Sequence, residues 1–445
     1  MFRDPDTLVG LGVGTTRITV IVAERDRRAP ESAHIIGIGS ASSLGIRKGL
    51  IVNLEQAVRS VRNALRDAEN MVGFQLEEAM VAFNANDVNS VMTSGMVSLR
   101  GGPRPVSVND VERVIEAAQS ELTIPGNKVA LHTIPVQYSI DGNFGIDDPL
   151  GMTGIRLEME LQTITVPMPC IHDVVNCVVK AGIRVEGLVI KPLASALGAL
   201  TDEEMRVGVI SISIGGGTTG LTFYRDGRPI RVSVIPIGGD HITSDLATVL
   251  RIPLNRAEEL KKKLFSTPEK DLFVVADSRG TPERTIDPNM VLEVIASRLE
   301  ELFLEYVQAQ IPERDPHHFP GGIVLSGGAA KMPGIETLLT DIFKMPVRVA
   351  SPLDYYQMPP GRNDTSFINA TGIIRYILCK ERNPYSFIDS PVSHLRLGVR
   401  VREPRDVKAP YSQYGSDRPV KTGSGGQSVK NVLEKIKESL KELFL

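Results

Sequence analysis

The sequence predicts an α/β protein built of two similar halves, with a small α+β insertion in the first half and a long tail. The main observation is an internal repeat: a strand, a Gly-Thr turn and a second strand open the chain and recur in its middle, with "VGTT" at 13–16 and "GGTT" at 216–219. From Asn84 to Gln162 the pattern changes to that of a separate small subdomain. After Arg402 the chain is rich in Pro, Gly, Ser and charge, which is typical of a flexible linker.

The first half is expected to alternate strands and helices. β-Branched strands flank the turn Gly14-Thr15-Thr16, and apolar residues that recur every three or four positions predict a helix from Asn53 to Val72. The insertion contains a Ser-capped helix, "SVNDVERVIEAAQSEL", and the strands "VALHTIPVQYSI" and "IRLEMELQTITVP". A helix closed by Gly182, and a strand that runs into the helical stretch "PLASALGAL", complete this half.

The second half repeats the opening pattern. It begins with three strands, joined by the glycine turn "GGGTT" and by a turn at Asp226-Gly227. A helix follows, which we expect to begin at His241 with Asp240 as its cap. "LNRAEELKKKLF" predicts a charged helix and "DPNMVLEVIASRLEELFLEYVQAQI" a long amphipathic one. "GGIVLSGGAAKMPGIETLLTDIF" predicts a strand, a glycine turn and a helix.

Composition excludes several classes of protein. The chain has 445 residues and a net charge of −3, so no overall positive field favours nucleic acid, and no nucleic-acid partner is expected. Its 3 cysteines form no CxxC pair, which argues against a disulfide framework and fits a reducing cytosol with buried thiols. The start, "MFRDPDTLVGLG", lacks the basic and apolar regions of a signal peptide. No apolar run is long enough for a transmembrane helix.

Glycine and threonine turns of this kind can bind phosphate, because glycine lets backbone N–H groups approach closely and threonine adds hydroxyl donors. One turn in each half could hold the phosphates from opposite sides of a cleft, while the third turn and the helix "AEELKK" could contact adenosine. Each turn alone is more typical of a plain hairpin, and "AEELKK" alone of a solvated helix face, but the four together favour a nucleotide site. The candidate residues are Gly14, Thr15, Thr16, Gly215, Gly216, Gly217, Thr218, Thr219, Gly239, Glu258, Lys261, Lys262, Gly327, Gly328 and Ala329.

The order of these motifs resembles that of the superfamily of actin, heat-shock chaperones and sugar kinases. Longer stretches are similar to one family within it, FtsA, the bacterial cell-division homologue of actin. These stretches are "ALHTIPVQYSIDG" through "DPLGMTG", "GIRVEGLVIKPLASALGALTDEE", "PIGGDHITSDLA" and "GGIVLSGGAAKMPGIETLLTDIFKMPVRV". With the motifs between them they span most of residues 8–380.

The resemblance implies a duplicated actin-like (ribonuclease H-like) fold, in which two lobes enclose a central nucleotide cleft. It also implies that the insertion is the extra subdomain that FtsA carries in place of actin's usual small domain. The expected divisions are 1–83 for the first part of lobe I, 84–162 for the insertion, 163–204 for the second part of lobe I, 205–402 for lobe II, 403–427 for the linker and 428–445 for a terminal amphipathic helix.

The resemblance further implies a role as an adaptor in bacterial cell division. Such a protein would bind ATP, associate with itself into filaments and lie on the cytoplasmic face of the inner membrane at the division site. Its partners would be the tubulin-like protein FtsZ, later divisome proteins through the inserted subdomain, and the membrane itself.

Three positions depart from the family's pattern. Gly12 and Ser213 stand where the two phosphate turns of the family usually begin with Asp, and Gly220 stands where another acidic residue is common. Those carboxylates hold magnesium and help to place the hydrolytic water. We therefore expect weak or altered nucleotide binding, doubtful magnesium binding and slow or absent hydrolysis, and we assign no catalytic residue and no metal ligand.

The last segment, "SVKNVLEKIKESLKELFL", predicts a helix with one apolar stripe and Lys and Glu on its remaining surface. The candidate membrane-binding residues are Val432, Leu433, Ile436, Leu440, Leu443 and Phe444. A membrane interface would bury this stripe, and so would the protein's own body or a partner helix. For the whole chain, the alternatives are an active ATPase of the same superfamily and an actin-like protein of pilus assembly.

Overall fold

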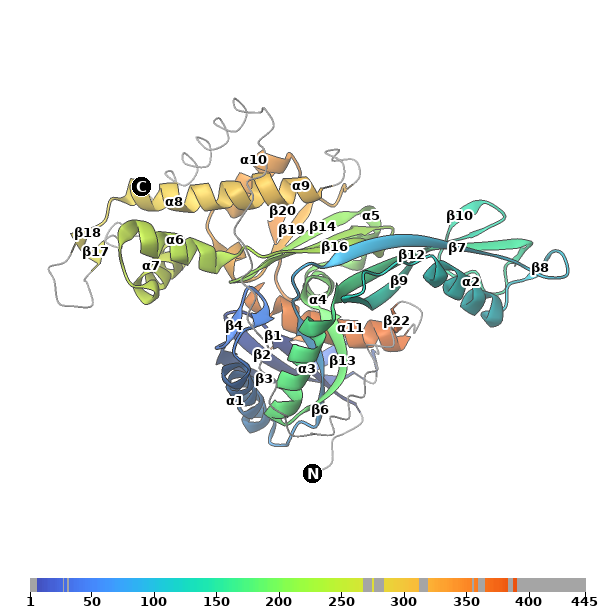
Figure 1. Cartoon of the computed structure of the whole chain (residues 1–445), viewed down its shortest axis with the longest axis horizontal. Coiled ribbons are helices and arrows are strands. Elements are labelled where there is room, and N and C mark those ends of the chain that lie inside the picture. Colours follow the sequence, from blue (N-terminus) through green and yellow to red (C-terminus); the bar gives the residue numbers. More distant parts are fainter. Residues whose placement is uncertain are drawn as a thin grey trace.

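The computed structural model describes residues 6–26, 28–29, 32–266, 274–275, 284–311, 319–353, 356–358, 365–382 and 387–389. The expected linker at 403–427 and the expected terminal helix at 428–445 lie outside these residues. Figure 1 shows two sheet-and-helix lobes stacked on one another, with an arm that extends sideways from their junction.

Lobe I is built on a six-stranded sheet in the order β13-β6-β1-β2-β3-β21. β1, β2 and β3 form an antiparallel meander, whereas β6 and β13 run parallel to β1. The strands are β1 (Thr7–Val13), β2 (Arg17–Arg25), β3 (Ala33–Ser42), β6 (Glu78–Phe83), β13 (Arg184–Ile190) and β21 (Tyr356–Gln357). Two short strands, β4 (Ile46–Arg47) and β5 (Leu50–Ile51), pair with each other beside it.

Helices cover both faces of this sheet. α1 (Leu54–Val72), capped by Asn53, packs closely on β3, where the backbone of Gly39 meets that of Ala64. α3 (Met168–Ala181) lies beside α1 and ends at Gly182 in the left-handed conformation, as the sequence predicts. α11 (Ile368–Arg382) covers the opposite face, and α4 (Lys191–Ala199) lies against it.

Lobe II repeats the plan of lobe I, which confirms the predicted duplication. Its five-stranded sheet has the order β16-β15-β14-β19-β20, which matches β3-β2-β1-β6-β13 strand by strand, with the same parallel and antiparallel pairs. The strands are β14 (Val209–Ile214), β15 (Thr219–Arg225), β16 (Arg228–Ile235), β19 (Ile323–Ser326) and β20 (Val347–Val349). Another pair, β17 (Val274–Val275) and β18 (Arg284–Thr285), lies at the far end of this lobe.

The helices of lobe II lie on the outer side of its sheet and at its end (Figure 1). The long amphipathic helix predicted from the sequence is present as α8, which continues without a break through a π-helical stretch into α9. The helical elements are α5 (Asp202–Val207), α6 (Gly239–Leu250), α7 (Leu254–Ser266), α8 (Pro288–Glu300), η2 (Glu301–Val307), α9 (Gln308–Gln310), η4 (Gly328–Lys331), α10 (Ile335–Phe343) and η5 (Thr365–Phe367).

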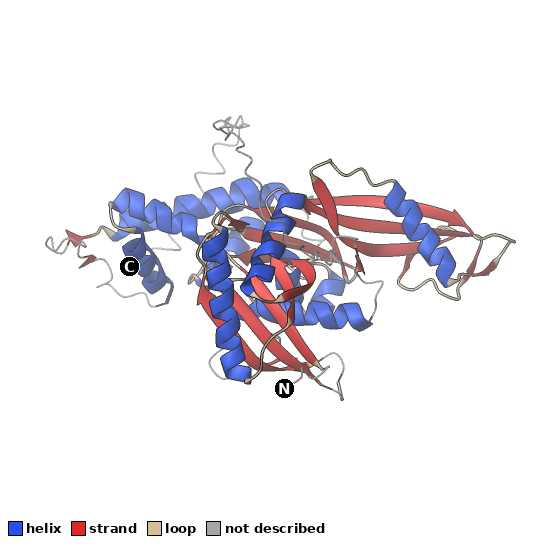
Figure 2. Ribbon diagram, turned by 60° about the horizontal axis from the view of Figure 1, so that its bottom comes forward, coloured by secondary structure: helices blue, strands red, loops and turns tan. Residues whose placement is uncertain are grey.

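The arm is the predicted α+β insertion. Its sheet has the order β10-β9-β12-β7, and α2 (Val108–Ser120) packs on one face through Val114 and Ala118 (Figure 2). The strands are β7 (Asn89–Ser98), β9 (Lys128–Ile140), β10 (Asn143–Ile146) and β12 (Arg156–Pro167), with the small pair β8 (Arg104–Pro105) and β11 (Thr153–Gly154). A strand from the end of the described chain, β22 (Ile388–Asp389), joins this sheet by pairing with β9 at Thr133 and His132.

α4 connects the two lobes. It is buried along almost its whole length and contacts both sheets. It crosses α11 at two glycines: a Cβ built on Gly372 would lie 1.7 Å from the carbonyl oxygen of Ala194, and one on Gly198 would lie 2.1 Å from that of Ile368. Glycine at both positions permits this close backbone approach. The first residue of α4, Lys191, is thereby brought to the junction of the lobes.

Within the described ranges, none of the helices combines the length and the apolar composition that crossing a bilayer requires.

Candidate functional site

The two repeated turns meet at the junction of the lobes. Gly14–Thr16 joins β1 to β2, and Gly215–Thr218 joins β14 to β15. A Cβ built on Gly216 would lie 2.3 Å from Thr16 Cγ2, and one on Gly217 would lie 2.7 Å from Thr15 Oγ1. The turns are therefore in van der Waals contact, and only residues without a side chain fit on the lobe II side. The structure thus brings together the two turns that the repeat predicted to face each other.

The first turn is held by the segment that follows β3. The backbone N–H of Gly49 donates to Thr15 Oγ1 at 3.0 Å, and that of Ser43 donates to the Thr16 carbonyl at 3.1 Å. Lys48 and Gly49 both have positive φ, 48° and 78°, which lets the chain bend tightly beside the turns. Lys48 is exposed here, and nothing in the sequence pattern pointed to it.

The second turn is fixed by bonds within lobe II and from lobe I. Thr219 Oγ1 is buried and donates to the Ile237 carbonyl at 2.8 Å, so this hydroxyl shapes the turn. Thr218 Oγ1 accepts from Asn84 Nδ2 at 2.7 Å, which ties the turn to the end of β6. The carbonyls of Gly215 and Gly216 accept from the first backbone N–H groups of α6, at 2.9 Å and 2.7 Å.

The start of α6 differs from the prediction. The helix begins at Gly239 with Gly238 as its N-cap, and His241 Nδ1 accepts from the Gly238 N–H at 3.1 Å. The prediction that Asp240 caps a helix beginning at His241 is therefore wrong, because Asp240 lies within the first turn of the helix. Its carboxylate faces the second glycine turn, with both oxygens within 2.9 Å of a Cβ built on Gly216. Burial raises the pKa of Asp240.

Glu258 and Lys261, expected at the adenosine, form a network with the start of α6. Lys261 is almost fully buried, and its Nζ donates to the Gly239 carbonyl at 2.9 Å and lies 2.7 Å from Thr243 Oγ1 and 2.6 Å from Glu258 Oε2. Lys262 reaches the other oxygen of Glu258 at 3.3 Å. Burial alone would raise the pKa of Glu258, but the bonds from Lys261 and Thr243 outweigh it and the pKa is lowered. These side chains brace α7 against α6.

The third turn lies beside this network. Gly327 has φ of 92°, and its N–H donates to Thr365 Oγ1 at 3.1 Å. Gly328 opens the short 3₁₀ segment η4, and the Cβ of Ala329 lies 3.5 Å from a Cβ built on Gly239. The four predicted motifs are thus neighbours around the start of α6, although they are spread over most of the chain.

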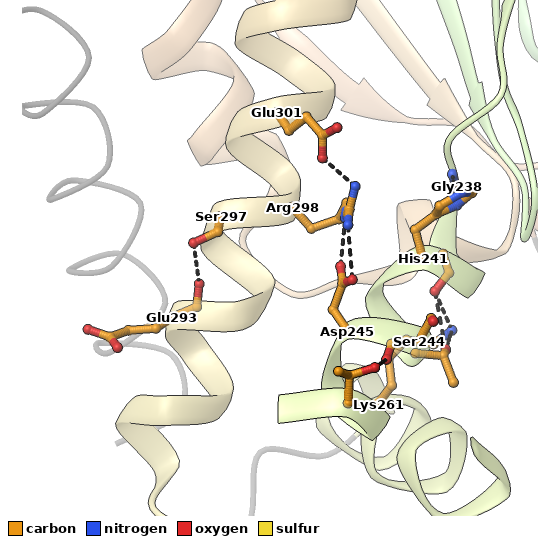
Figure 3. A network of polar contacts seen from close by, with 12 residues as sticks. Gly238, His241, Ser244, Asp245, Lys261, Glu293, Ser297, Arg298 and Glu301 are labelled. Atoms are coloured by element: carbon orange, nitrogen blue, oxygen red, sulfur yellow. Dashed lines mark hydrogen bonds and ion pairs between the residues drawn. The ribbon is translucent and has the colours of Figure 1, made fainter. Parts of the chain in front are cut away.

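Arg298 supports this region from α8, a role that no sequence pattern indicated. Its guanidinium binds Asp245 of α6 with two bonds, of 2.6 Å and 2.9 Å, and also bonds to Glu301 (Figure 3). Such paired bonds between a guanidinium and a carboxylate fix orientation as well as distance. The pair holds α8 along α6.

The donor set does not suit magnesium. A Cβ built on Gly12 would lie 3.1 Å from Asn369 Oδ1, and one on Gly220 would lie 2.6 Å from Pro192 Cγ. Pro192 of α4 therefore fills the space that a side chain at Gly220 would need, and Asn369 of α11 crowds the space at Gly12. Within the described residues, no group of three or more His, Cys, Asp or Glu side chains is placed to hold a metal ion.

A lysine also lies at this junction, on the side of the first turn. Nζ of Lys191 lies 3.0 Å from a Cβ built on Gly14, directly at the first turn. Asn369 Nδ2 fixes the start of α4 by donating to the Lys191 carbonyl at 3.3 Å and to Ser195 Oγ at 3.1 Å. Burial lowers the pKa of Lys191 to about 8. Sequence reasoning missed this residue, although a lysine between an apolar strand and a helix-starting proline is a detectable signal.

Comparison with known proteins agrees with this architecture. The family model "Cell division protein FtsA" matches residues 210–372, and the model "SHS2 domain inserted in FTSA" matches residues 85–165. Cell division protein FtsA of Bacillus subtilis is 36% identical over 83% of this chain and 82% of its own, and that of Pseudomonas aeruginosa is 34% identical over 87% and 93%. Among solved structures, the PilM-PilN type IV pilus biogenesis complex matches with a TM-score of 0.56 and 17% identity, over 83% of this chain and 98% of that one, which is a likeness of fold.

Proposed function

This chain belongs to the FtsA family of cell-division proteins, and we propose that it acts there as an actin-like adaptor that links FtsZ filaments to the cytoplasmic membrane. The observation that carries the proposal is the inserted arm between two duplicated lobes, in the place where the SHS2 model matches. A pilus-assembly protein is the less favoured reading, because the FtsA relatives share 30–36% identity with this chain and the PilM complex shares 17%.

The cleft is proposed to bind a nucleotide, with ATP as the expected ligand. The phosphates would lie against the turns at Gly14–Thr16 and Gly215–Thr218, and the adenosine against Glu258, Lys262 and the third glycine turn. Support comes from the convergence of these motifs on the start of α6. Hydrolysis is expected to be slow, because the positions that would supply a base and metal ligands are Gly12, Ser213 and Gly220. An active ATPase is the alternative, and measured turnover would favour it.

Membrane attachment is proposed to come from residues 428–445. Their sequence places Val432, Leu433, Ile436, Leu440, Leu443 and Phe444 on one helical stripe. One such helix binds a lipid interface weakly, so many copies in a filament would add avidity. In this proposal the protein lies at the division site on the inner face of the membrane, and the arm contacts neighbouring protomers and later divisome proteins.

Sedimentation with liposomes tests the proposal. The full chain should pellet with liposomes of anionic lipid and should carry purified FtsZ with it, whereas a chain that stops at Arg402 should do neither. A matched control keeps the length and changes only the stripe, as in Leu433→Glu with Leu440→Glu, and should stay in the supernatant. If the full chain also stays in the supernatant, the tether is wrong. If it pellets without FtsZ, the adaptor role is wrong and the membrane attachment stands.

A further inference from the structure

In the part of the chain that the structure describes, three lysine or arginine residues are buried, and each pairs with a carboxylate. Lys128 pairs with Asp87 at 2.7 Å, Lys261 pairs with Glu258 at 2.6 Å, and Arg375 pairs with Asp202 at 2.7 Å. In each pair the cationic side chain is at most 8% exposed. This is the usual arrangement, because a charge taken out of water is costly unless an opposite charge or hydrogen bonds compensate it.

Lys191 differs from these three. It is part-buried at the start of α4, and burial is the one cause of its lowered pKa, which no carboxylate among the described residues offsets. Among the described residues, its ammonium group has no hydrogen bond or ion pair. An ammonium group held in this way at a glycine turn has unused capacity to bind an anion.

The surroundings of Lys191 explain why an anion would come here without a metal ion. Pro192 and Asn369 fill the space beside Gly220 and Gly12, where carboxylates for magnesium would stand. Asn369 also bonds to the Lys191 carbonyl, so the same side chain blocks one carboxylate position and fixes the start of the helix that brings the ammonium group. The junction therefore lacks carboxylates at positions 12 and 220 and contains a cation of its own.

We propose that Lys191 binds the nucleotide's phosphates directly, from the side of the first turn, and supplies the positive charge that magnesium would otherwise bring, so that the nucleotide binds without a divalent metal. This inference rests on the proposed nucleotide binding and specifies its chemistry. Lysine binds phosphate as a point charge and needs no carboxylate ligands, unlike Mg²⁺, which is held by carboxylates together with phosphate oxygens and water. The flanking turns add backbone N–H donors around the same anion.

Calorimetric titration of the full chain with ATP, once with millimolar MgCl₂ and once with excess EDTA, tests this inference. The two buffers are matched in ionic strength, because salt screens charge. The wild-type dissociation constant should agree within about threefold between the two buffers. Lys191→Met should weaken binding in EDTA by about tenfold or more, which corresponds to loss of one charge-assisted contact. Lys191→Arg should retain most of the affinity, because the positive charge stays.

The matched control is Lys180→Met, which removes an exposed lysine on α3 away from the turns and should bind like the wild type. Thermal melting without ligand checks that each variant is folded. If Lys191→Met does not fold, Lys191→Gln serves as a second variant without the charge. Titration with inorganic tripolyphosphate should repeat the dependence on Lys191, because the proposed contact is with phosphate.

Each outcome decides between the two proposals. If the wild type binds ATP only with magnesium, or if Lys191→Met and Lys191→Gln bind as tightly as the wild type, the role of Lys191 is overturned while nucleotide binding stands. If the wild type binds ATP in neither buffer, the proposed nucleotide function fails and this inference fails with it.

Discussion

The crossing of α4 and α11 predicts that one methyl group at Gly372 will weaken lobe I. A Cβ at this position would lie 1.7 Å from the Ala194 carbonyl oxygen and 2.8 Å from the Gly198 nitrogen. Real Cβ contacts do not fall below 3.0 Å, so the helices would have to separate by about 1.3 Å or distort. Both contacts are with backbone, which cannot swing aside as a flexible side chain can.

The magnitude follows from two opposing effects of Gly372→Ala. Overpacking of a close interface costs about 1–3 kcal/mol and sometimes more. Replacing glycine by alanine inside a helix stabilises the helix by about 1 kcal/mol. Because this overlap is with backbone on both sides, the upper part of the first range applies, and we expect a net loss of about 2–3 kcal/mol.

Thermal unfolding measures the loss. For a lobe of ordinary domain size, 1 kcal/mol lowers the melting temperature by about 2–4 °C, so Gly372→Ala should melt about 4–12 °C below the wild type. Gly126→Ala is the matched control, because a Cβ built on Gly126 would meet no atom within 4 Å beyond its chain neighbours and its φ is not positive. This variant should melt with the wild type. Gly198→Ala should behave like Gly372→Ala, and the double variant should lose less than the sum. If Gly372→Ala melts within 1 °C of the wild type, the close crossing is wrong.

Three further predictions concern charge and space. Arg104→Met should lower the stability of the arm in chemical denaturation, because it removes two bonds of 2.7 Å to the buried Asp110. Those bonds hold the pKa of Asp110 well below its ordinary value, so the wild-type arm should lose this stabilisation as the pH falls below about 4, whereas the variant should change less. Lys191→Met should raise the free energy of unfolding at pH 7 by about 1–3 kcal/mol, because it removes an uncompensated charge. The pKa of Lys191 is about 8 in the folded protein and 10.5 ordinarily, so the lysine is charged in both states below pH 8. The added stability of the variant should therefore be complete below pH 8 and fade as the pH rises to 10.5. Gly220→Asp should destabilise the protein by about 1–3 kcal/mol and create no magnesium-dependent phosphate release, because Pro192 fills the space that the new side chain would need.

Each of these has an outcome that would contradict it. Arg104→Met should be compared with Arg100→Met, which changes an exposed arginine nearby; equal stability of the two would show that the buried pair contributes little. For Lys191→Met, an advantage that persists unchanged at pH 10.5 would mean that charge is not its origin. For Gly220→Asp, magnesium-dependent phosphate release would show that the carboxylate position is open.

The sequence was sufficient for features that depend on neighbours along the chain. The period of residues 53–72 predicted α1, Gly182 predicted the end of α3, and the repeated turns predicted two lobes with matching sheets. It was insufficient where partners are far apart in the chain. Lys191 reaches Gly14 only because α4 packs between the sheets, and nothing local in "KPLASALGAL" specifies that neighbour.

Glu258 and Lys261 give a second example of the same limit. Their spacing places them on neighbouring turns of one helix, and in the structure they form an ion pair. The spacing did not reveal that Lys261 would be buried against the Gly239 carbonyl, because this depends on how α7 lies against the start of α6. Asp240 was misassigned for a similar reason: the carbonyls of Gly215 and Gly216 bind the first N–H groups of α6 and fix where that helix begins.

The pairing of β22 with β9 couples the orientation of the arm to lobe I. The two-residue ladder joins Ile388 and Asp389 to Thr133 and His132 of β9, and the adjacent Phe387 is buried against Tyr376 of α11. β9 also carries His132 to the Ile190 N–H at the end of β13. A rotation of the arm relative to lobe I would therefore have to disturb all of these contacts together, so the arm and α11 should move as one unit.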